Sequence, residues 1–259
     1  MRLLYHLRRH PIAMAARFRH SLVLTYAFPP AVLQPLIPPG LALDTFDGCA
    51  FAAVALVDTQ GMRPQAVPAG FGFDSYLAGY RIFTRLSGAA SLRGLRILRS
   101  ETNRLPMLLG GNLLTHYQYR LADIRVDHQP SCLRWRIATP DHSADLDITA
   151  DLSSHPEHPP QGSPFPDWRE ARRFAGPLPY TFDYEEETNS IIRIQGVRRS
   201  WTPRPVSVTV NEIGFFEQAM FGGVKPILAN AFYIPAVPSY TWKRGVRLPL
   251  ERKETALCS

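Results

Sequence analysis

Short apolar runs separated by turn residues recur along the whole chain, and most of them have the spacing of strands. Leu22–Phe28 is rich in β-branched and aromatic residues, and Cys49–Val57 is apolar without alternation, which is typical of a strand buried on both faces. Tyr76–Leu86 and Leu92–Ser100 flank the turn residues 87–90, and this arrangement predicts a β-hairpin. Arginine alternates with apolar residues in both arms of the hairpin, which is the period of a half-buried strand.

The same pattern continues to the last quarter of the chain, with little helical spacing. Further strands are predicted at His116–Val126, Cys132–Ala138, Ala144–Leu152, Ile191–Trp201, Val206–Val210, Ile227–Ile234 and Ser239–Lys243. Helical spacing is confined to residues 31–36, Asp167–Phe174 and Glu212–Phe221. Ten or more short strands with a few short helices predict a mainly β protein, built as a barrel or a highly curved sheet.

Proline punctuates the chain and bears on its division into domains. The 24 prolines among 259 residues exclude long helices. Residues 153–180 are the most proline-rich stretch, but strands of the same character resume on both sides, so we interpret it as a surface excursion and not as a linker. The expected organisation is a basic arm or short helix at 1–19, one domain at 20–245 and a charged tail at 246–259.

Composition and charge exclude several classes of protein. The net charge is +7, but the 26 arginines are dispersed among apolar residues, so we expect no nucleic-acid partner. No apolar run reaches the ~18–20 residues of a membrane span. The cysteines at 49, 132 and 258 have no disulfide or zinc spacing, so we expect a reducing, cytoplasmic setting. His155 and His158 are separated and flanked by prolines, so we expect no metal site there. We also expect no cofactor.

One segment gathers side chains that could serve chemistry. Residues 100–107 place Glu101, Asn103 and Arg104 at the end of a strand, followed by Met107 and a double glycine. Polar residues at a strand end before a glycine-rich loop often line the mouth of a pocket. The alternative is a strand-end cap with a Glu–Arg pair on the surface, and composition does not separate the two interpretations.

Five phrases in this order and spacing resemble a known group of proteins. They are residues 22–43, 54–61, 101–111, 197–203 and 228–235, the last reading Leu-Ala-Asn-Ala-Phe-Tyr-Ile-Pro. Together they resemble the acetoacetate decarboxylase-like superfamily, and most closely the family called domain of unknown function 2071. The resemblance implies a large, incomplete, antiparallel, cone-shaped β-barrel around a central pocket, in agreement with the strand count.

The resemblance also implies what this chain lacks. Enzymes of the superfamily carry a Schiff-base lysine in the pattern Glu, four residues, Pro, Lys; here Glu101 and Pro106 match the pattern, but Met107 stands at the lysine position. A thioether cannot condense with a ketone. The carboxylate-gripping arginine of the superfamily corresponds to Ala27, and a pocket glutamate corresponds to Ala52. The resemblance therefore implies the fold and the pocket without imine-forming decarboxylation.

The remaining candidates are arginines and hydrogen-bonding side chains. Arg81, Arg85 and Arg104 could clamp an anion, because arginine binds a carboxylate through two parallel hydrogen bonds. The candidates for polar contacts are Asn103, Asn112, His116 and Tyr117. His116 is either a general base near neutral pH or a structural histidine. Lys225 is either a substitute nucleophile or a surface lysine.

Three functions remain open at this point. The first is a pocket protein that binds or transforms a small organic acid or ketone without a Schiff base. The second is a non-enzymatic binder of an apolar ligand. The third is a structural or regulatory protein with a vestigial pocket. An incomplete barrel also exposes strand edges, which a homo-oligomer would cover.

Overall fold

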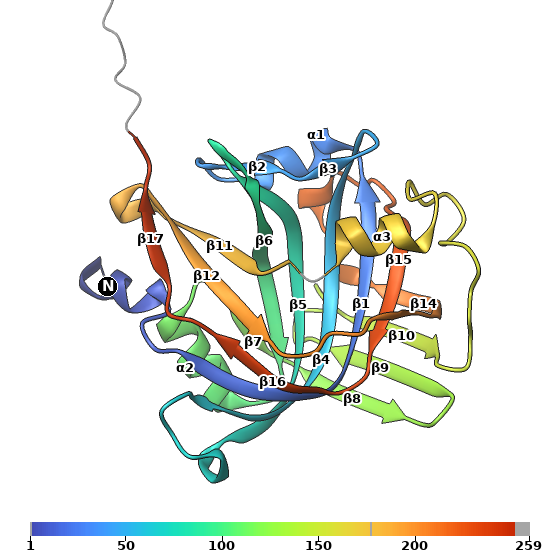
Figure 1. The fold of residues 1–259 in the computed structure, drawn as a ribbon, viewed down its shortest axis with the longest axis horizontal. Coiled ribbons are helices and arrows are strands. Elements are labelled where there is room, and N and C mark those ends of the chain that lie inside the picture. The colour runs from blue at the N-terminus through green and yellow to red at the C-terminus, as the bar shows by residue number, and fades with distance from the viewer. Residues whose placement is uncertain (1, 177, 252–259) are drawn as a thin grey trace, which may run out of the picture.

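One long strand, β1 (Met14–Phe28), organises the larger of two sheets (Figure 1). The computed structural model describes residues 2–176 and 178–251. Along one edge β1 pairs with β4 (Cys49–Pro64), from Met14↔Pro64 to Phe28↔Ala50. Along its other edge it pairs first with β16 (Val237–Trp242) and then with β15 (Ile227–Ile234). One strand therefore joins the beginning of the chain to its last quarter.

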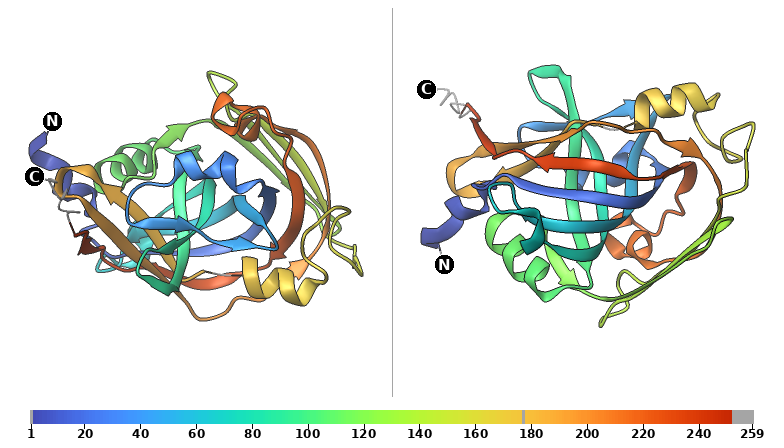
Figure 2. Two further views of the ribbon diagram at one scale, coloured as in Figure 1. Left: turned by 90° about the horizontal axis from the view of Figure 1, so that it is seen from above. Right: turned by 60° about the horizontal axis from the view of Figure 1, so that its bottom comes forward.

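The larger sheet closes on itself through the pairing of β1 with β4 (Figure 2). From β1 the path runs through β16, β12 (Ser190–Arg198) and β11 (Tyr180–Glu185) to β6 (Ala89–Thr102), and then through β5 (Phe73–Leu86) to β4. The join between β6 and β11 is parallel and consists of two register pairs, Tyr180↔Gly94 and Thr181↔Leu95. The result is a barrel that is closed in part, with a short seam between β6 and β11.

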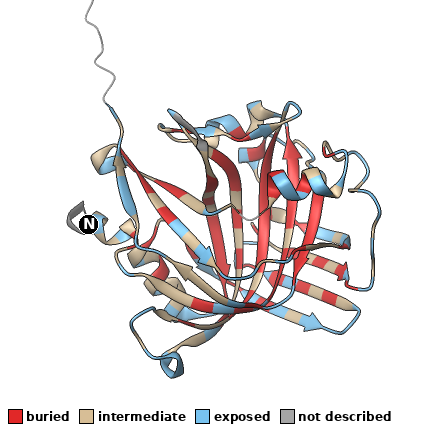
Figure 3. Cartoon of the chain, in the orientation of Figure 1, coloured by how far each residue is buried: buried red, intermediate tan, exposed pale blue. Residues whose placement is uncertain are grey.

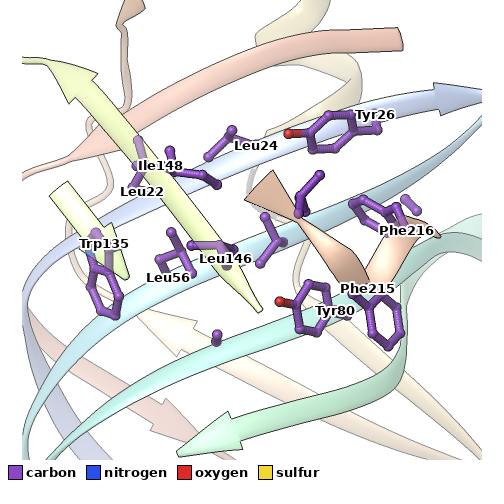
Figure 4. Packing of buried hydrophobic residues seen from close by; sticks show 14 of the residues in the cluster. Leu22, Leu24, Tyr26, Leu56, Tyr80, Trp135, Leu146, Ile148, Phe215 and Phe216 are labelled. Atoms are coloured by element: carbon purple, nitrogen blue, oxygen red, sulfur yellow. The ribbon is translucent and has the colours of Figure 1, made fainter. Parts of the chain in front are cut away.

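A second sheet covers the outside of this barrel. It has the order β14 (Ser207–Ile213), β10 (Leu146–Asp151), β9 (Cys132–Ala138), β8 (Asp123–His128). Between the two sheets lies the largest apolar core, which includes Leu22, Leu24, Leu56, Trp135 and Ile148 (Figure 4). Buried residues run almost unbroken along the central strands and alternate with less buried ones on β9 and β10, because only one face of the second sheet meets this core (Figure 3).

The remaining elements are short. The α-helices are α1 (Pro30–Leu33), α2 (Leu105–Leu114) and α3 (Trp168–Ala175), and the 3₁₀ turns are η1 (Arg2–Arg9), η2 (Gln34–Leu36), η3 (Ala69–Phe71), η4 (Glu186–Thr188), η5 (Gly214–Glu217) and η6 (Ala219–Phe221). The small strands are β2 (Leu41–Leu43), β3 (Thr45–Phe46), β7 (Tyr119–Leu121), β13 (Arg204–Pro205) and β17 (Val246–Pro249). None of the described helices has the length and apolar character needed to cross a membrane.

The predicted fold class is confirmed, and three local differences have physical causes. Residues 14–19, assigned to the arm, belong to β1, where buried Ala16 and Phe18 alternate with exposed arginines. Residues 246–249, assigned to the tail, pair with β12, whereas 252–259 lie outside the described residues. The expected helix at 212–221 is two 3₁₀ turns after the end of β14, since Phe215, Phe216 and Phe221 must all enter the core between the sheets.

Candidate functional site

The interior of the barrel contains a cavity of about 170 Å³. Alternate residues of each ring strand face it, because successive side chains of a strand point to opposite faces. On β4 the cavity is lined by Ala53, Ala55 and Val57, while the residues between them pack against the second sheet. The larger apolar side chains of the lining are Phe18, Val23, Leu77, Phe83, Leu95, Ile97, Leu178, Trp201, Phe232, Ile234 and Trp242.

A guanidinium group enters this apolar lining from β5. Arg81 lies two residues beyond Gly79, and its Nε donates to the carbonyl oxygen of Gly79 at 3.3 Å. A Cβ on Gly79 would lie 3.3 Å from Nη2 of Arg81, so the glycine leaves room for the guanidinium to fold over the strand. Burial lowers the pKa of Arg81, and the phenols of Tyr240, Tyr117 and Tyr119 act in the opposite direction.

A second guanidinium group lines the cavity from β12. The Cζ of Arg198 lies 4.7 Å from the ring centroid of Trp201, a distance at which a cation is attracted to an aromatic face. Burial lowers the pKa of Arg198, and a hydrogen bond with the phenol of Tyr240 counteracts this. Within the described ranges, no aspartate or glutamate is among the residues that line the cavity. The cavity is therefore apolar on most of its surface and cationic at two points.

Hydroxyl groups complete the polar part of the lining, from Tyr117, Tyr119, Tyr180, Tyr240, Ser21, Ser100 and Thr181. Tyr117 Oη lies 2.7 Å from Thr181 Oγ1, across the seam between β6 and β11. Tyr240 rests on Gly196, where a Cβ would come within 2.2 Å of the phenolic oxygen. Burial raises the pKa of Tyr117, Tyr119 and Tyr240 above the ordinary value, so all three remain neutral hydrogen-bond donors at physiological pH.

A buried carboxyl group lies on β11, two residues beyond Thr181. Asp183 is 2% exposed, and its Oδ2 has no hydrogen-bond partner among the described residues. Burial raises the pKa of Asp183 to about 7, and the charge of Arg96 only partly opposes this. Asp183 is not part of the cavity lining, whereas Tyr117 and Tyr119 are. The charge of Asp183 raises the pKa of both phenols.

Comparison with known proteins agrees with this architecture. The model of a family described as an uncharacterised conserved protein, domain of unknown function 2071, matches residues 15–238. The chain belongs to this family. No curated protein matches its sequence at a significant level. The family name carries no activity, so the site must be interpreted from its own residues.

Solved structures with the same fold include enzymes of the acetoacetate decarboxylase type. An acetoacetate decarboxylase-like enzyme from Sphingomonas wittichii RW1 is 12% identical, with a TM-score of 0.62 over 93% of this chain and 94% of that one. The enduracididine biosynthesis enzyme MppR complexed with pyruvate is 11% identical, with a TM-score of 0.60 over 92% and 90%. The acetoacetate decarboxylase from Legionella pneumophila is 13% identical, with a TM-score of 0.56 over 91% and 86%. At these identities the likeness establishes the fold.

The sequence candidates of this family member are not all at the cavity. Among them, Arg81 and Tyr117 line it. Glu101 instead faces the second sheet, fully buried, where it accepts a hydrogen bond from Nε of Arg99. The cause is a β-bulge: Tyr80 pairs with Arg99 and Arg81 pairs with Ile97, so one extra residue shifts the alternation of β6. After the bulge Ser100 lines the cavity, and Glu101 points away from it.

The candidates that follow Glu101 have structural contacts. Asn103 Oδ1 accepts from the backbone nitrogen of Tyr76 at 2.9 Å, and Arg104 Nε donates to the carbonyl oxygen of Asp74 at 3.0 Å. Both contacts are those of the strand-end cap that the sequence left open. Met107 is partly buried on α2, where it packs against the edges of two apolar clusters.

The other three candidates also make contacts outside the cavity lining. Arg85 pairs with the buried Asp44, which Arg93 also contacts. Asn112 bonds to both the nitrogen and the oxygen of Tyr119, at 2.8 Å each. His116 is half-buried, its Nε2 has no partner among the described residues, and burial lowers its pKa.

The cavity contains residues that the sequence did not single out. Arg198 and Tyr240 both belong to predicted strands, but nothing local indicates which face of a curved sheet points inward. Gly196 was the available signal, because a glycine inside a strand often marks a close approach of another group. Ala52, which the resemblance places at a pocket glutamate, packs against the second sheet, and its neighbour Ala53 lines the cavity.

Proposed function

We propose that this protein binds, and in its cellular setting transforms or senses, a small organic acid or ketone in the central cavity, without a Schiff base. The observation that carries the proposal is the guanidinium of Arg81, which enters an apolar lining that contains no described carboxylate. Desolvating a cation without an opposite charge is costly, and a bound carboxylate would offset that cost through two charge-assisted hydrogen bonds. Free Cys49 and Cys132 are consistent with a reducing cytoplasm as the location.

The absence of imine chemistry is part of this proposal. A Schiff base needs a neutral amine within about 3–3.5 Å of the ketone carbon. The described lysines, Lys225 and Lys243, are not among the residues that line the cavity, and Lys253 lies outside the described residues. Borohydride treatment with acetoacetate or pyruvate should therefore leave the intact mass unchanged. An adduct that is lost in Lys225→Ala would overturn this part of the proposal.

Ligand binding is tested with a matched pair of arginine variants. Arg81 and Arg85 lie on the same strand, but Arg85 pairs with Asp44 outside the cavity lining. Pyruvate, acetoacetate and butyrate would be titrated by calorimetry into the wild type, Arg81→Met and Arg85→Met. We expect at least a tenfold loss of carboxylate affinity in Arg81→Met and little change in Arg85→Met. Equal losses, or no binding of any acid by the wild type, would refute the proposal.

A purely apolar ligand is the competing function, and the same titrations address it. Benzene is neither an acid nor a ketone and is bound by apolar cavities of about this volume. If the wild type binds benzene more tightly than every acid and ketone tested, and Arg81→Met binds benzene more tightly still, the apolar-ligand function is supported instead.

A further inference from the structure

The cavity has two cationic points that are held apart. Arg81 stands on β5 and Arg198 on β12, and β6 and β11 lie between these strands in the ring. Each guanidinium is fixed near its own strand: Arg81 folds over Gly79 and Arg198 lies against Trp201. The two guanidinium groups therefore enter the cavity from strands that are separated by two others in the ring.

The region between the two guanidinium groups combines apolar and neutral polar groups. Leu95 and Ile97 of β6 line the cavity between the two arginine-bearing strands. The phenol of Tyr240 is within electrostatic reach of both cations, because each of them lowers its pKa against the larger effect of burial. A ligand that spans the two cations would lay a short carbon chain against these side chains and could accept a hydrogen bond from the phenol.

Size and charge together select the ligand. A cavity of about 150 Å³ holds a benzene molecule, so about 170 Å³ suits a ligand of roughly six to ten non-hydrogen atoms. The lining contributes two formal positive charges and, within the described residues, no negative one. We propose that the preferred ligand is a short aliphatic dicarboxylate, of about four to six carbons, with one carboxylate at Arg81 and the other at Arg198. This rests on the proposed function and specifies the substrate class for the same site.

The test compares each dicarboxylate with its own monomethyl ester. Succinate, glutarate and adipate, and their three monoesters, would be titrated by calorimetry into the wild type at one ionic strength. The ester keeps the carbon skeleton and removes one charge. We expect the best dicarboxylate to bind at least tenfold more tightly than its monoester, because a charge-assisted pair at Arg198 is lost in the ester.

Variants on β12 separate the second contact from general damage. Arg198→Met should abolish the advantage of the dicarboxylate and leave the monoester affinity within about twofold, while Arg198→Lys should retain part of the advantage. Arg193→Met is the control on the same strand, because Arg193 covers the ring of the lining residue Tyr180 but does not itself line the cavity. Thermal melting of each variant verifies that it is folded.

The outcomes are distinguishable. If the dicarboxylate and its monoester bind equally in the wild type, the dicarboxylate inference fails and the proposed organic-acid function stands. The inference also fails if Arg193→Met removes the advantage as completely as Arg198→Met. If neither ligand of any pair binds, both proposals fail.

Discussion

The buried carboxyl group of Asp183 makes a specific contribution to stability that depends on pH. Its pKa is raised from 3.8 to about 7 by burial, so the native state binds this proton more tightly than the unfolded chain does. The stabilising contribution is therefore present below pH 3.8 and is lost as the pH rises through about 7. The difference of about three pH units corresponds to about 4 kcal/mol in total, since one unit is worth about 1.4 kcal/mol.

The substitution Asp183→Asn isolates this contribution, because the amide is close in shape to the protonated acid and does not ionise. The free energy of unfolding of the variant minus that of the wild type should increase by about 3 kcal/mol between about pH 4.5 and pH 7.5. Urea denaturation at several pH values, followed by tryptophan fluorescence, measures it. A difference that stays constant within about 1 kcal/mol over this range would refute the reasoning.

The comparison must be made between variant and wild type because another buried group acts in the opposite direction. Burial lowers the pKa of His20 to about 4, so the contribution of His20 to stability increases as the pH rises from about 4 to 6.5. In the wild type the two effects oppose each other over this range. Asp147→Asn is the control of opposite sign, since its hydrogen bond with Arg134 lowers the pKa of Asp147 and stabilises the folded state at neutral pH.

Two further predictions concern packing around the barrel. Glu101→Gln removes the buried carboxylate beside the guanidinium of Arg99, which is 6% exposed, and leaves it only the exposed Asp141 at 3.7 Å. The change should cost about 3 kcal/mol, or about 5 °C in Tm by calorimetry. A loss below about 1 kcal/mol, or an equal loss in a double variant with apolar residues at both positions, would contradict it. Gly111→Ala places a Cβ 2.2 Å from the ring of Tyr119. It should lower the free energy of unfolding, measured by urea denaturation, by about 1–3 kcal/mol. Unchanged stability would show that the ring moves freely.

Local patterns predicted strands whose neighbours are close in sequence and also strands such as β15, whose partner β1 lies at the other end of the chain. Ile227–Ile234 has the expected bounds, and the hairpin of β5 and β6 follows the predicted alternation. β11 was missed, although it forms a hairpin with the following strand β12, because it begins directly after the proline-rich segment. Its second pairing, with β6, is to a strand about 80 residues earlier and lies outside any local window.

The candidate site was harder to predict than the fold, because the register of each strand decides which of its side chains point into the cavity. Without the bulge opposite Tyr80 and Arg81, Glu101 would share the face of Leu95 and Ile97. One inserted residue reverses that assignment, and the sequence around it carries no glycine or proline that marks the insertion. Arg81 lies on β5, where the alternation is unbroken from Leu77 to Phe83, and was predictable as a candidate.

The central position of β1 determines the order in which a chain emerging from the ribosome can complete this fold. β1 can pair with β4 within the first quarter of synthesis, but β15 and β16 are translated about 200 residues after it. Until then one edge of β1 has no partner and could accept a foreign strand. A nascent chain stopped before Ile227 could still form the β1–β4–β5–β6 sheet, yet the wall of the cavity that β15 and β16 supply would be open to solvent.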